Sequence, residues 1–333
     1  MRHFFVINPH SFRTLGSLKR ILMDLENCFS VGRRMEYKIY ISRHPRDAIA
    51  AVHRYMISVP YDETVRVYAV GGDGILFDCL NGMVNFPNAE LTSVPYGSAN
   101  DFVRTFGKTS RQAFRDIKKL SVAPSRPVDI IHCGANYALI EVNIGLIGLT
   151  VYHANKLLRG SSKWIHRYTS SIYNLSGVRS LINSEVQKQG YSIKMDDIDM
   201  SGDYCNIHIA NVPCDGGSNV PSPYSIPDDG ELEAIFIRPG SKLDLARKIN
   251  DRNKGYFEKH DMFVYKKCRT MDIESEAPLC VQMDGEAFFA RDIKLKIVPK
   301  GIKFFAPEGL SFTDYSYMAY NKRKVQSQEE SGK

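Results

Sequence analysis

The first 125 residues alternate between short apolar runs and longer segments whose apolar residues recur at helical spacing. The apolar runs predict β-strands at residues 3–8, 35–41, 65–70 and 90–97. The amphipathic segments predict helices at residues 14–29, 45–57, 75–84, 99–107 and 110–120. Strands that alternate with helices at this spacing indicate a parallel sheet covered by helices, which is a Rossmann-like three-layer α/β domain.

The pattern changes after a polar, proline-marked segment at residues 121–127. Strands are now predicted at residues 128–133, 137–145, 191–195, 204–212, 231–239, 262–273, 279–285 and 293–299, with a helical insertion at about 149–183. Many strands in succession are typical of an antiparallel β-sandwich. We therefore expect an α/β domain at residues 1–125, a β-sandwich domain at 126–302 and a polar tail at 321–333.

Charge and cysteine usage exclude several classes of protein. The net charge of +7 is modest, and the chain has no helix-turn-helix, zinc-finger or RRM pattern, so we expect no nucleic-acid partner. The seven cysteines are odd in number and form no CxxC pair, which favours buried thiols in a reducing compartment. No signal peptide pattern and no run of about 18 apolar residues is present, so we expect a cytoplasmic protein.

One basic stretch stands out against this background. Between Arg238 and Arg269 the chain carries ten Lys and Arg residues against four acidic ones. Such a stretch suits either contact with anionic lipid or phosphate, or an ordinary solvated face.

Three polar turns follow predicted strands in the first domain. The run "VYAVGGDGILFDCLNGM" places Gly71, Gly72, Asp73 and Gly74 between a strand and a helix, where backbone N–H groups form an anion site. A carboxylate at Asp73 makes sense there through Mg²⁺ or through a hydroxyl group. The alternative is a tight turn in which Asp73 caps the next helix.

The other two turns are "PYGSANDFVRTFG" at residues 95–107 and "INPHS" at residues 7–11. Gly97 and Ser98 offer N–H and hydroxyl donors, and Asn100 or Asp101 either caps the following helix or contacts a ligand. Because the carboxyl ends of parallel strands lie at one edge of a sheet, we expect the three turns to face one crevice.

These motifs together resemble the diacylglycerol kinase catalytic family, which includes bacterial soluble lipid kinases and the sphingosine and ceramide kinases. The matching stretches run from residue 4 to about residue 289 and are "INPHS", "GGDGILFDCLNGM", "PYGSANDFVRTFG", "VDIIHCGANYALIEVNIG", "PDDGELEAIFI" and "MDGEAF". GGDG is shared with NAD kinases and phosphofructokinases, but its combination with the other segments is more specific.

The resemblance implies a GGDG-loop domain like those of NAD kinases and diacylglycerol kinases, a C-terminal β-sandwich, and ATP in the cleft between them. The end of the chain, residues 303–320, is expected to return to the first domain. The implied activity is an ATP- and Mg²⁺-dependent lipid kinase that phosphorylates the hydroxyl of a diacylglycerol-like or sphingoid lipid. The implied location is the inner face of a membrane, to which the protein binds peripherally. The oligomeric state stays open, with a homodimer as one candidate.

The resemblance also implies roles for individual residues. The nucleotide would be bound by Asn8, Ser42, Gly71, Gly72, Asp73, Gly74, Ser98 and Asn100. Asp284 and Glu286 of "MDGEAF" would be the candidates for general base. A structural Mg²⁺ would be held by the Asp229 carboxylate and by the backbone carbonyls of Ile226 and Glu231. Without the resemblance, Asp284 would be read as part of a hairpin turn and residues 226–231 as a solvated loop.

The chain departs from the family pattern at three places. Ile75 stands where the family usually has Thr, Phe77-Asp78 where it commonly has Asn-Glu, and Phe12 near the usual glycine of the first loop. Losing the Thr hydroxyl removes one expected phosphate contact, a net loss of about 0.5–3 kcal/mol.

The departures motivate a second hypothesis, a catalytically weak homologue that binds nucleotide or lipid and regulates another process. An NAD kinase is a third reading, although the PYGSAND and DGE segments fit lipid kinases better. Residues 144–183 either line a lipid entrance or pack a core, with Trp164 and its basic neighbours as candidates for membrane contact.

Overall fold

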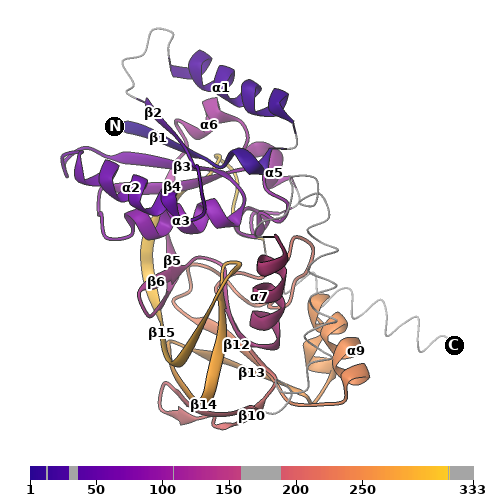
Figure 1. Ribbon diagram of the computed structural model, residues 1–333. Helices are drawn as coiled ribbons and strands as arrows, with labels where there is room; N and C mark the ends of the chain where they lie inside the picture. The colour runs from indigo at the N-terminus through magenta and orange to yellow at the C-terminus, as the bar shows by residue number, and fades with distance from the viewer. Residues whose placement is uncertain (13, 30–36, 108, 159–188, 314, 316–333) are drawn as a thin grey trace, which may run out of the picture.

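A parallel sheet forms the centre of the first half of the computed structural model, which describes residues 1–12, 14–29, 37–107, 109–158, 189–313 and 315 (Figure 1). Its strands lie in the order β2–β1–β3–β4 and are β1 (Arg2–Ile7), β2 (Tyr37–Ile41), β3 (Val65–Gly71) and β4 (Ala89–Pro95). β3 is buried along its whole length, as expected for a parallel strand with both faces covered.

Helices cover this sheet in two packed groups. The long ones are α1 (Leu15–Phe29), α2 (Asp47–Ile57) and α3 (Asp73–Met83), and α2 packs on α3. The predicted helix at 99–107 is only the single turn α4 (Asp101–Arg104). The predicted helix at 110–120 is two short helices, α5 (Ser110–Ala113) and α6 (Ile117–Leu120). It is broken because the Asp116 carboxylate caps α6 by accepting from the Lys119 N–H at 3.1 Å.

The second half is an antiparallel β-sandwich, as the sequence predicts. Its strands are β5 (Ser125–Cys133), β6 (Asn136–Ala138), β7 (Glu141–Gly145), β8 (Gln189–Met195), β9 (Ile198–Asp199), β10 (Gly202–Tyr204), β11 (Asn206–Ala210), β12 (Leu232–Ile237), β13 (Phe263–Cys268), β14 (Thr270–Met283) and β15 (Glu286–Phe305). β14 pairs with β8 near its start and with β7 near its end, with a bulge between Glu274 and Leu279. It therefore contributes to both layers of the sandwich.

Among the described residues, two α-helices accompany the sandwich. α7 (Leu146–Leu158) packs on β7, β14 and β15 and is the part of the predicted insertion that the structure describes. Residues 159–183, with Trp164, lie outside the described residues. α9 (Lys242–Asn253) lies within the basic stretch, where the sequence reading identified no helix. Ser241 caps it by accepting from the Asp244 N–H at 3.2 Å.

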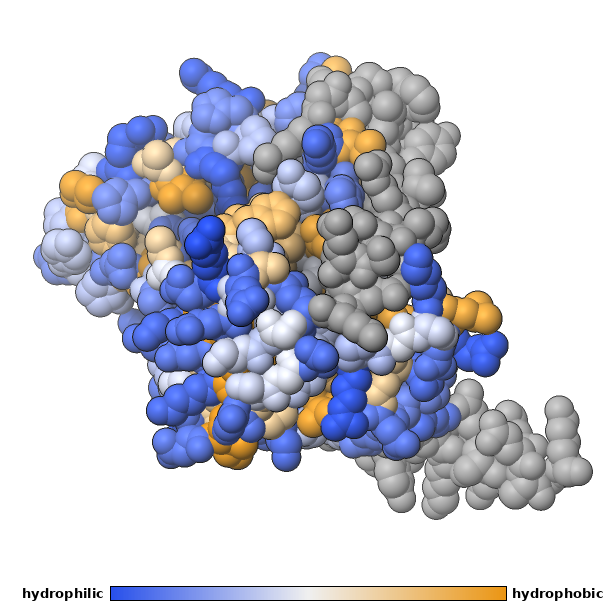
Figure 2. All heavy atoms as spheres, turned by 60° about the horizontal axis from the view of Figure 1, so that its bottom comes forward, coloured by the Kyte–Doolittle hydropathy of each residue, from blue (hydrophilic) through white to orange (hydrophobic). Residues whose placement is uncertain are grey.

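The outer face of the sandwich end is mainly hydrophilic, with apolar side chains in small separate groups (Figure 2). Among the residues that the structure describes, no helix is both long and apolar enough to cross a membrane.

β15 connects the two halves. Its residues Lys303 and Phe304 pair in parallel with β4, and the Thr92 hydroxyl donates to the Phe305 carbonyl at 2.7 Å. The buried side chain of Phe77, on α3, reaches in the other direction and packs into the core of the sandwich. The two halves therefore share β15 and core contacts, which fix how they sit against each other. Residues 316–333 lie outside the described part of the chain.

Candidate active site

The glycine turns after β3 and β4 contact each other through their backbones. A Cβ at Gly97 would lie 2.3 Å from the Gly72 Cα, and the N–H groups of Tyr96 and Gly97 both donate to the Gly71 carbonyl, at 2.7 and 2.8 Å. Only glycine fits this approach, so the turns need their glycines first of all for packing. The two turns lie together at the carboxyl edge of the sheet, as predicted.

Gly74 differs from its neighbours because it faces open space. It is exposed, and a Cβ there would meet nothing within 4 Å. Gly74 lies in the first turn of the 11-residue helix α3, whose first N–H groups have no partner within the helix. This end of α3 therefore has the room and the donors that bind a phosphate group.

The other predicted nucleotide residues follow the first two strands. Asn8 caps the short helix η1 (Pro9–Ser11), and its side-chain oxygen accepts from the His10 N–H at 3.0 Å. The Ser42 hydroxyl donates to Asp47 at 2.7 Å, and the Ser42 N–H donates to the Ile7 carbonyl at 2.9 Å. Asn8 and Ser42 thus lie at the same sheet edge as the glycine turns.

Asp73 links the turns and does not cap its own helix, where Gly72 is the N-cap residue. Its Oδ1 accepts from the Asp101 N–H at 2.9 Å. Asp101 in turn accepts from Arg104 at 2.8 Å and from the Gly217 N–H at 2.9 Å. The capping alternative is therefore wrong, and the two carboxylates join segments from both halves of the molecule.

Asp284 lies in the two-residue turn between β14 and β15, with φ of 45°. Its carboxylate is buried and accepts from the N–H groups of Leu139, Ile140 and Glu141, at 2.7, 3.0 and 2.9 Å. The hairpin reading of this turn is correct, but the turn also anchors the start of β7. Three amide donors leave little of this carboxylate available to a substrate.

The pKa values of Asp73, Asp101 and Asp284 are all raised, first by burial and then by neighbouring carboxyl groups. Burial raises the pKa of Asp73 most, and the nearby Asp101 and Asp284 raise it further. Burial also raises the pKa of Asp284 to about 6, against the opposing effect of its three amide donors. The pKa of Asp101 is raised by burial and then by Asp215. Arg104 compensates only part of this acidity, since the pKa of Asp101 stays raised, and the remaining negative charge of the cluster suits a bound divalent cation.

Glu286 is held by a residue that the sequence did not single out. Its Oε2 lies 3.5 Å from Nη2 of Arg46, whose Nη1 lies 3.2 Å from Oδ1 of Asp78. The Arg46 guanidinium also stacks 4.3 Å over the Phe77 ring. The Phe77-Asp78 departure therefore forms part of the contact between α2, α3 and β15.

Two residues expected near the nucleotide are buried. Ile75 is buried at 3% exposure and would contact a Cβ on Gly71 through its Cγ2 at 2.8 Å. It faces the core, and the expected loss of a phosphate contact at this position stays a prediction. Asn100 is also buried, with φ of 54°, and its amide donates to the Gly97 carbonyl at 2.7 Å. It shapes the turn, whereas Ser98 is exposed at the same turn.

Two arginines reinforce this second turn. Arg111 donates to the Gly97 carbonyl, and Arg115 donates to the Pro95 carbonyl at 2.9 Å. Both line a cavity of about 680 Å³. They bring positive charge next to the turn, which favours an anionic ligand there.

The predicted structural Mg²⁺ residues lie elsewhere, around Lys267. Its ammonium lies 3.4 Å from Asp229 Oδ2 and 3.0 Å from Glu231 Oε2. The Ile226 carbonyl accepts from the Asp229 N–H at 3.4 Å. These residues do not fit a divalent cation, because the carboxylate that would bind it already pairs with an ammonium.

Behind Asp284 lies a buried polar network that sequence reasoning missed. Glu141, His208 and Asp215 bring potential metal-binding atoms within 4.8 Å of one another. The fully buried Arg252 lies 4.0 Å from Asp215 and provides a compensating positive charge. These residues come from separate strands and loops and share no motif, so no signal in the sequence points to them.

Comparisons with known proteins find relatives for both halves of the chain. Residues 2–133 match the sequence model of the diacylglycerol kinase catalytic domain, and residues 157–306 match that of the YegS C-terminal NAD kinase beta sandwich-like domain. A Staphylococcus haemolyticus protein named "Putative lipid kinase SH2167" is 25% identical over 281 residues, which are 80% of this chain and 84% of that protein. A Staphylococcus aureus protein named "Putative lipid kinase SAB0675c" is 27% identical over 250 residues, 73% of this chain and 78% of its own length.

Solved structures show the same fold. A crystal structure of a "putative diacylglycerol kinase" from Bacillus anthracis superposes with a TM-score of 0.70 at 21% identity, over 92% of this chain and 97% of the other. Another diacylglycerol kinase structure from the same organism gives a TM-score of 0.65 at 18% identity, over 93% and 98% of the two chains. The chain therefore matches, in order, a diacylglycerol kinase catalytic domain and a YegS C-terminal NAD kinase beta sandwich-like domain, and it has the fold of the diacylglycerol kinases of known structure.

Proposed function

We propose that this protein is an ATP- and Mg²⁺-dependent lipid kinase that transfers the γ-phosphate to the hydroxyl of a diacylglycerol-like or sphingoid lipid. The observation that supports it best is the junction of Gly72, Gly97 and Asp73. There the open side of Gly74 at the start of α3 lies close to the carboxyl group of Asp73, which accepts from the Asp101 N–H. Phosphoryl transfer needs this combination of phosphate alignment and nearby acidic groups.

The residues of the cleft fit a nucleotide with its cation. The open N-terminal turn of α3 at Gly74 and the guanidinium groups of Arg111 and Arg115 suit the phosphates. The carboxyl group of Asp101, whose pKa is raised by burial and by Asp215, suits Mg²⁺ and leaves Asp73 beside it for proton transfer. When bound, Mg²⁺ neutralises charge on the phosphates.

Asp73 is the best general base in the cleft. Its Oδ1 accepts from the Asp101 N–H at 2.9 Å, and the Asn100 N–H also interacts with this carboxyl group, so two backbone donors fix its position. Its raised pKa makes it a better proton acceptor than an ordinary carboxylate. Asp284 instead positions the start of β7, and Glu286 is held by Arg46.

The acceptor would be taken from a membrane surface, because such lipids do not leave the bilayer freely. The protein would bind that surface peripherally from its cytoplasmic side, with the basic stretch around α9 as the candidate contact for anionic lipid.

Transfer of radiolabelled phosphate from ATP to a panel of lipids, with NAD as a further acceptor, tests the proposal. We expect at least one lipid to become labelled, and we expect this labelling to be lost when Mg²⁺ is removed. ATP binding without any labelled lipid would favour the regulatory homologue, and labelled NAD alone would favour an NAD kinase.

A further inference from the structure

The loop at residues 226–231 is held in place by contacts within the protein. The Asp129 N–H donates to the Pro227 carbonyl at 2.8 Å. The Asp129 carboxylate accepts from the Gly230 N–H at 2.7 Å and from the Lys300 N–H at 2.7 Å. The loop is thereby tied to β5 and β15 by hydrogen bonds that need no metal.

Three carboxylates converge on the ammonium of Lys267. Nζ lies 3.0 Å from Glu231 Oε2, 3.2 Å from Glu233 Oε1 and 3.4 Å from Asp229 Oδ2. Glu233 is buried and lies directly opposite Lys267 in the β12–β13 pair, so its charge needs a partner. Burial lowers the pKa of Lys267, but the three carboxylates outweigh it and raise the pKa above its ordinary value, so the ammonium stays charged.

We propose that the Lys267 ammonium takes the place of the structural divalent cation that the family resemblance implies for this loop, so that the loop binds no Mg²⁺. Asp229 already uses both carboxylate oxygens, Oδ1 for the Glu231 N–H at 3.0 Å and Oδ2 for Lys267. A divalent cation at this carboxylate would be repelled by the ammonium beside it. The fixed positive charge of Lys267 therefore neutralises the carboxylates of this loop, as a bound cation would.

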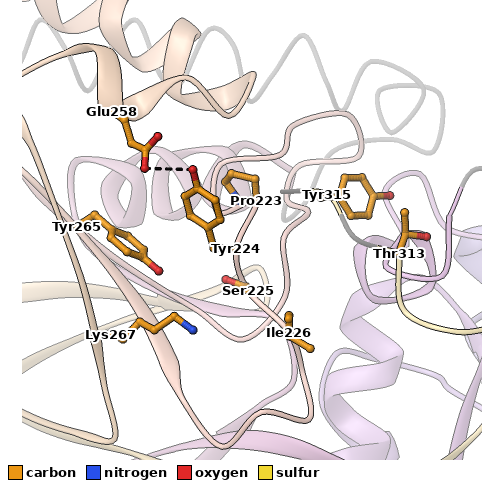
Figure 3. A pocket seen from close by; sticks show the side chains of 9 residues that line it. All are labelled: Pro223, Tyr224, Ser225, Ile226, Glu258, Tyr265, Lys267, Thr313 and Tyr315. Atoms are coloured by element: carbon orange, nitrogen blue, oxygen red, sulfur yellow. Dashed lines mark hydrogen bonds between the residues drawn. The ribbon is translucent and has the colours of Figure 1, made fainter. Parts of the chain in front are cut away.

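The loop is not shielded from solvent, so its lack of fit to Mg²⁺ does not come from blocked access. A cavity of about 410 Å³ adjoins the loop, lined by Ser225, Ile226, Tyr265 and Lys267 among others (Figure 3). The Lys267 side chain extends from its strand toward the segment that carries Ser225 and Ile226. A hydrated ion can reach this place, so removing the ammonium should turn the three carboxylates into a cation site.

Thermal unfolding of the full chain without nucleotide or lipid, in EDTA and in millimolar MgCl₂, tests the proposal. We expect the loop of the wild type to gain no stability from Mg²⁺. Lys267→Met should unfold several degrees lower in EDTA and regain most of that loss in MgCl₂, because the ion replaces the lost charge. Lys266→Met is the matched control: Lys266 is the exposed neighbour on β13, its side chain points to the other face of the strand, and it should behave like the wild type.

A rise of the wild-type midpoint in MgCl₂ that Asp229→Asn abolishes would overturn the proposal. A rise that Asp229→Asn retains comes from other carboxylates, such as those of the cleft, and leaves the loop metal-free as proposed. If Lys267→Met does not fold, crystals of the wild type grown with MnCl₂ decide the matter. Anomalous density beside Asp229 refutes the inference, and its absence there supports it. None of these outcomes depends on kinase activity, so this inference and the proposed function fail separately.

Discussion

Gly97→Ala offers the sharpest test of how the two glycine turns fit together. The added Cβ would lie 2.3 Å from the Gly72 Cα and 2.9 Å from the Gly72 N, and both atoms belong to the backbone. The turns would have to separate by about 0.7 Å to reach even the 3.0 Å at which real Cβ contacts begin. Overpacking of this kind costs about 1–3 kcal/mol. The midpoint of thermal unfolding should fall by about 1.5–4 °C, since a chain of 333 residues unfolds with an entropy of about 0.7 kcal/mol/K.

The separation should also disturb the site. The Asp73–Asp101 hydrogen bond crosses between the two turns, so moving one turn displaces the carboxyl group from its partner. A misplacement of about 1 Å can cost roughly 100-fold in rate, and we expect a loss of that order in kcat/KM for ATP in the lipid-phosphorylation assay.

Gly74→Ala is the matched control in the same motif. Its Cβ meets nothing within 4 Å, and alanine favours a helix over glycine by up to about 1 kcal/mol, so the variant should be as stable as the wild type or more so. Its KM for ATP should nevertheless rise, because the new methyl group occupies the side that a phosphate would approach. Wild-type stability and activity in Gly97→Ala would refute the backbone contact. An unchanged KM in Gly74→Ala would refute the placement of the phosphates.

Three further predictions concern the acidic cluster. Asp73→Asn should lower kcat by about 10²–10⁴-fold, and a kcat equal to that of the wild type would exclude Asp73 as the base. The variant should be at least as stable as the wild type at neutral pH, because the Asp73 carboxylate is buried and is repelled by Asp101 and Asp284. Asp284→Asn should instead destabilise the protein by roughly 2 kcal/mol or more in urea unfolding, because an amide cannot accept from all three N–H groups as the carboxylate does; an unchanged urea midpoint would contradict the anchoring role. The raised pKa of Asp73 means that the folded state binds the proton more tightly than the unfolded state, so its contribution to stability is present below the unfolded pKa of about 4 and is lost as pH rises through the folded pKa. The stability gained by Asp73→Asn over the wild type should therefore grow from about pH 4 upward, and a gain independent of pH would contradict this sign.

Local patterns predicted most of the fold because strand and helix signals agree with the tertiary structure along the first domain. β1 and β3 are nearly continuous apolar runs, as parallel strands covered on both faces require, and the turns after β3 and β4 meet because parallel strands end at one edge. The helix α9 was missed because its surface is mostly charged and its buried face consists of little more than Leu245 and Arg252. Because the helix has so few apolar residues, the sequence shows no helical periodicity there.

The sequence does not predict which residues far apart in the chain form hydrogen bonds or ion pairs with each other. Asp284 was expected to act on a substrate because it follows the family motif, but nothing near it in the chain reveals the three amides that it accepts from, which are more than 140 positions away. The same holds for Lys267 and its carboxylates, since Asp229 lies 38 residues before it on another segment. The role of such a carboxylate depends on its hydrogen-bond and ion-pair partners, and these are known only from the tertiary structure.

The departures from the family pattern change packing more than the ligand side of the site. Ile75 points into the core, and Phe77 fills the sandwich core under the Arg46 guanidinium. The groups that would face a phosphate are backbone amides and the open side of Gly74, which these substitutions do not alter. A weak affinity for ATP would therefore have to originate in the first loop, where Phe12 stacks on Tyr96 at 4.4 Å beside the second turn. A Phe12→Gly variant that binds ATP more tightly would support this, whereas tighter binding by Ile75→Thr instead would return the cause to the GGDG turn.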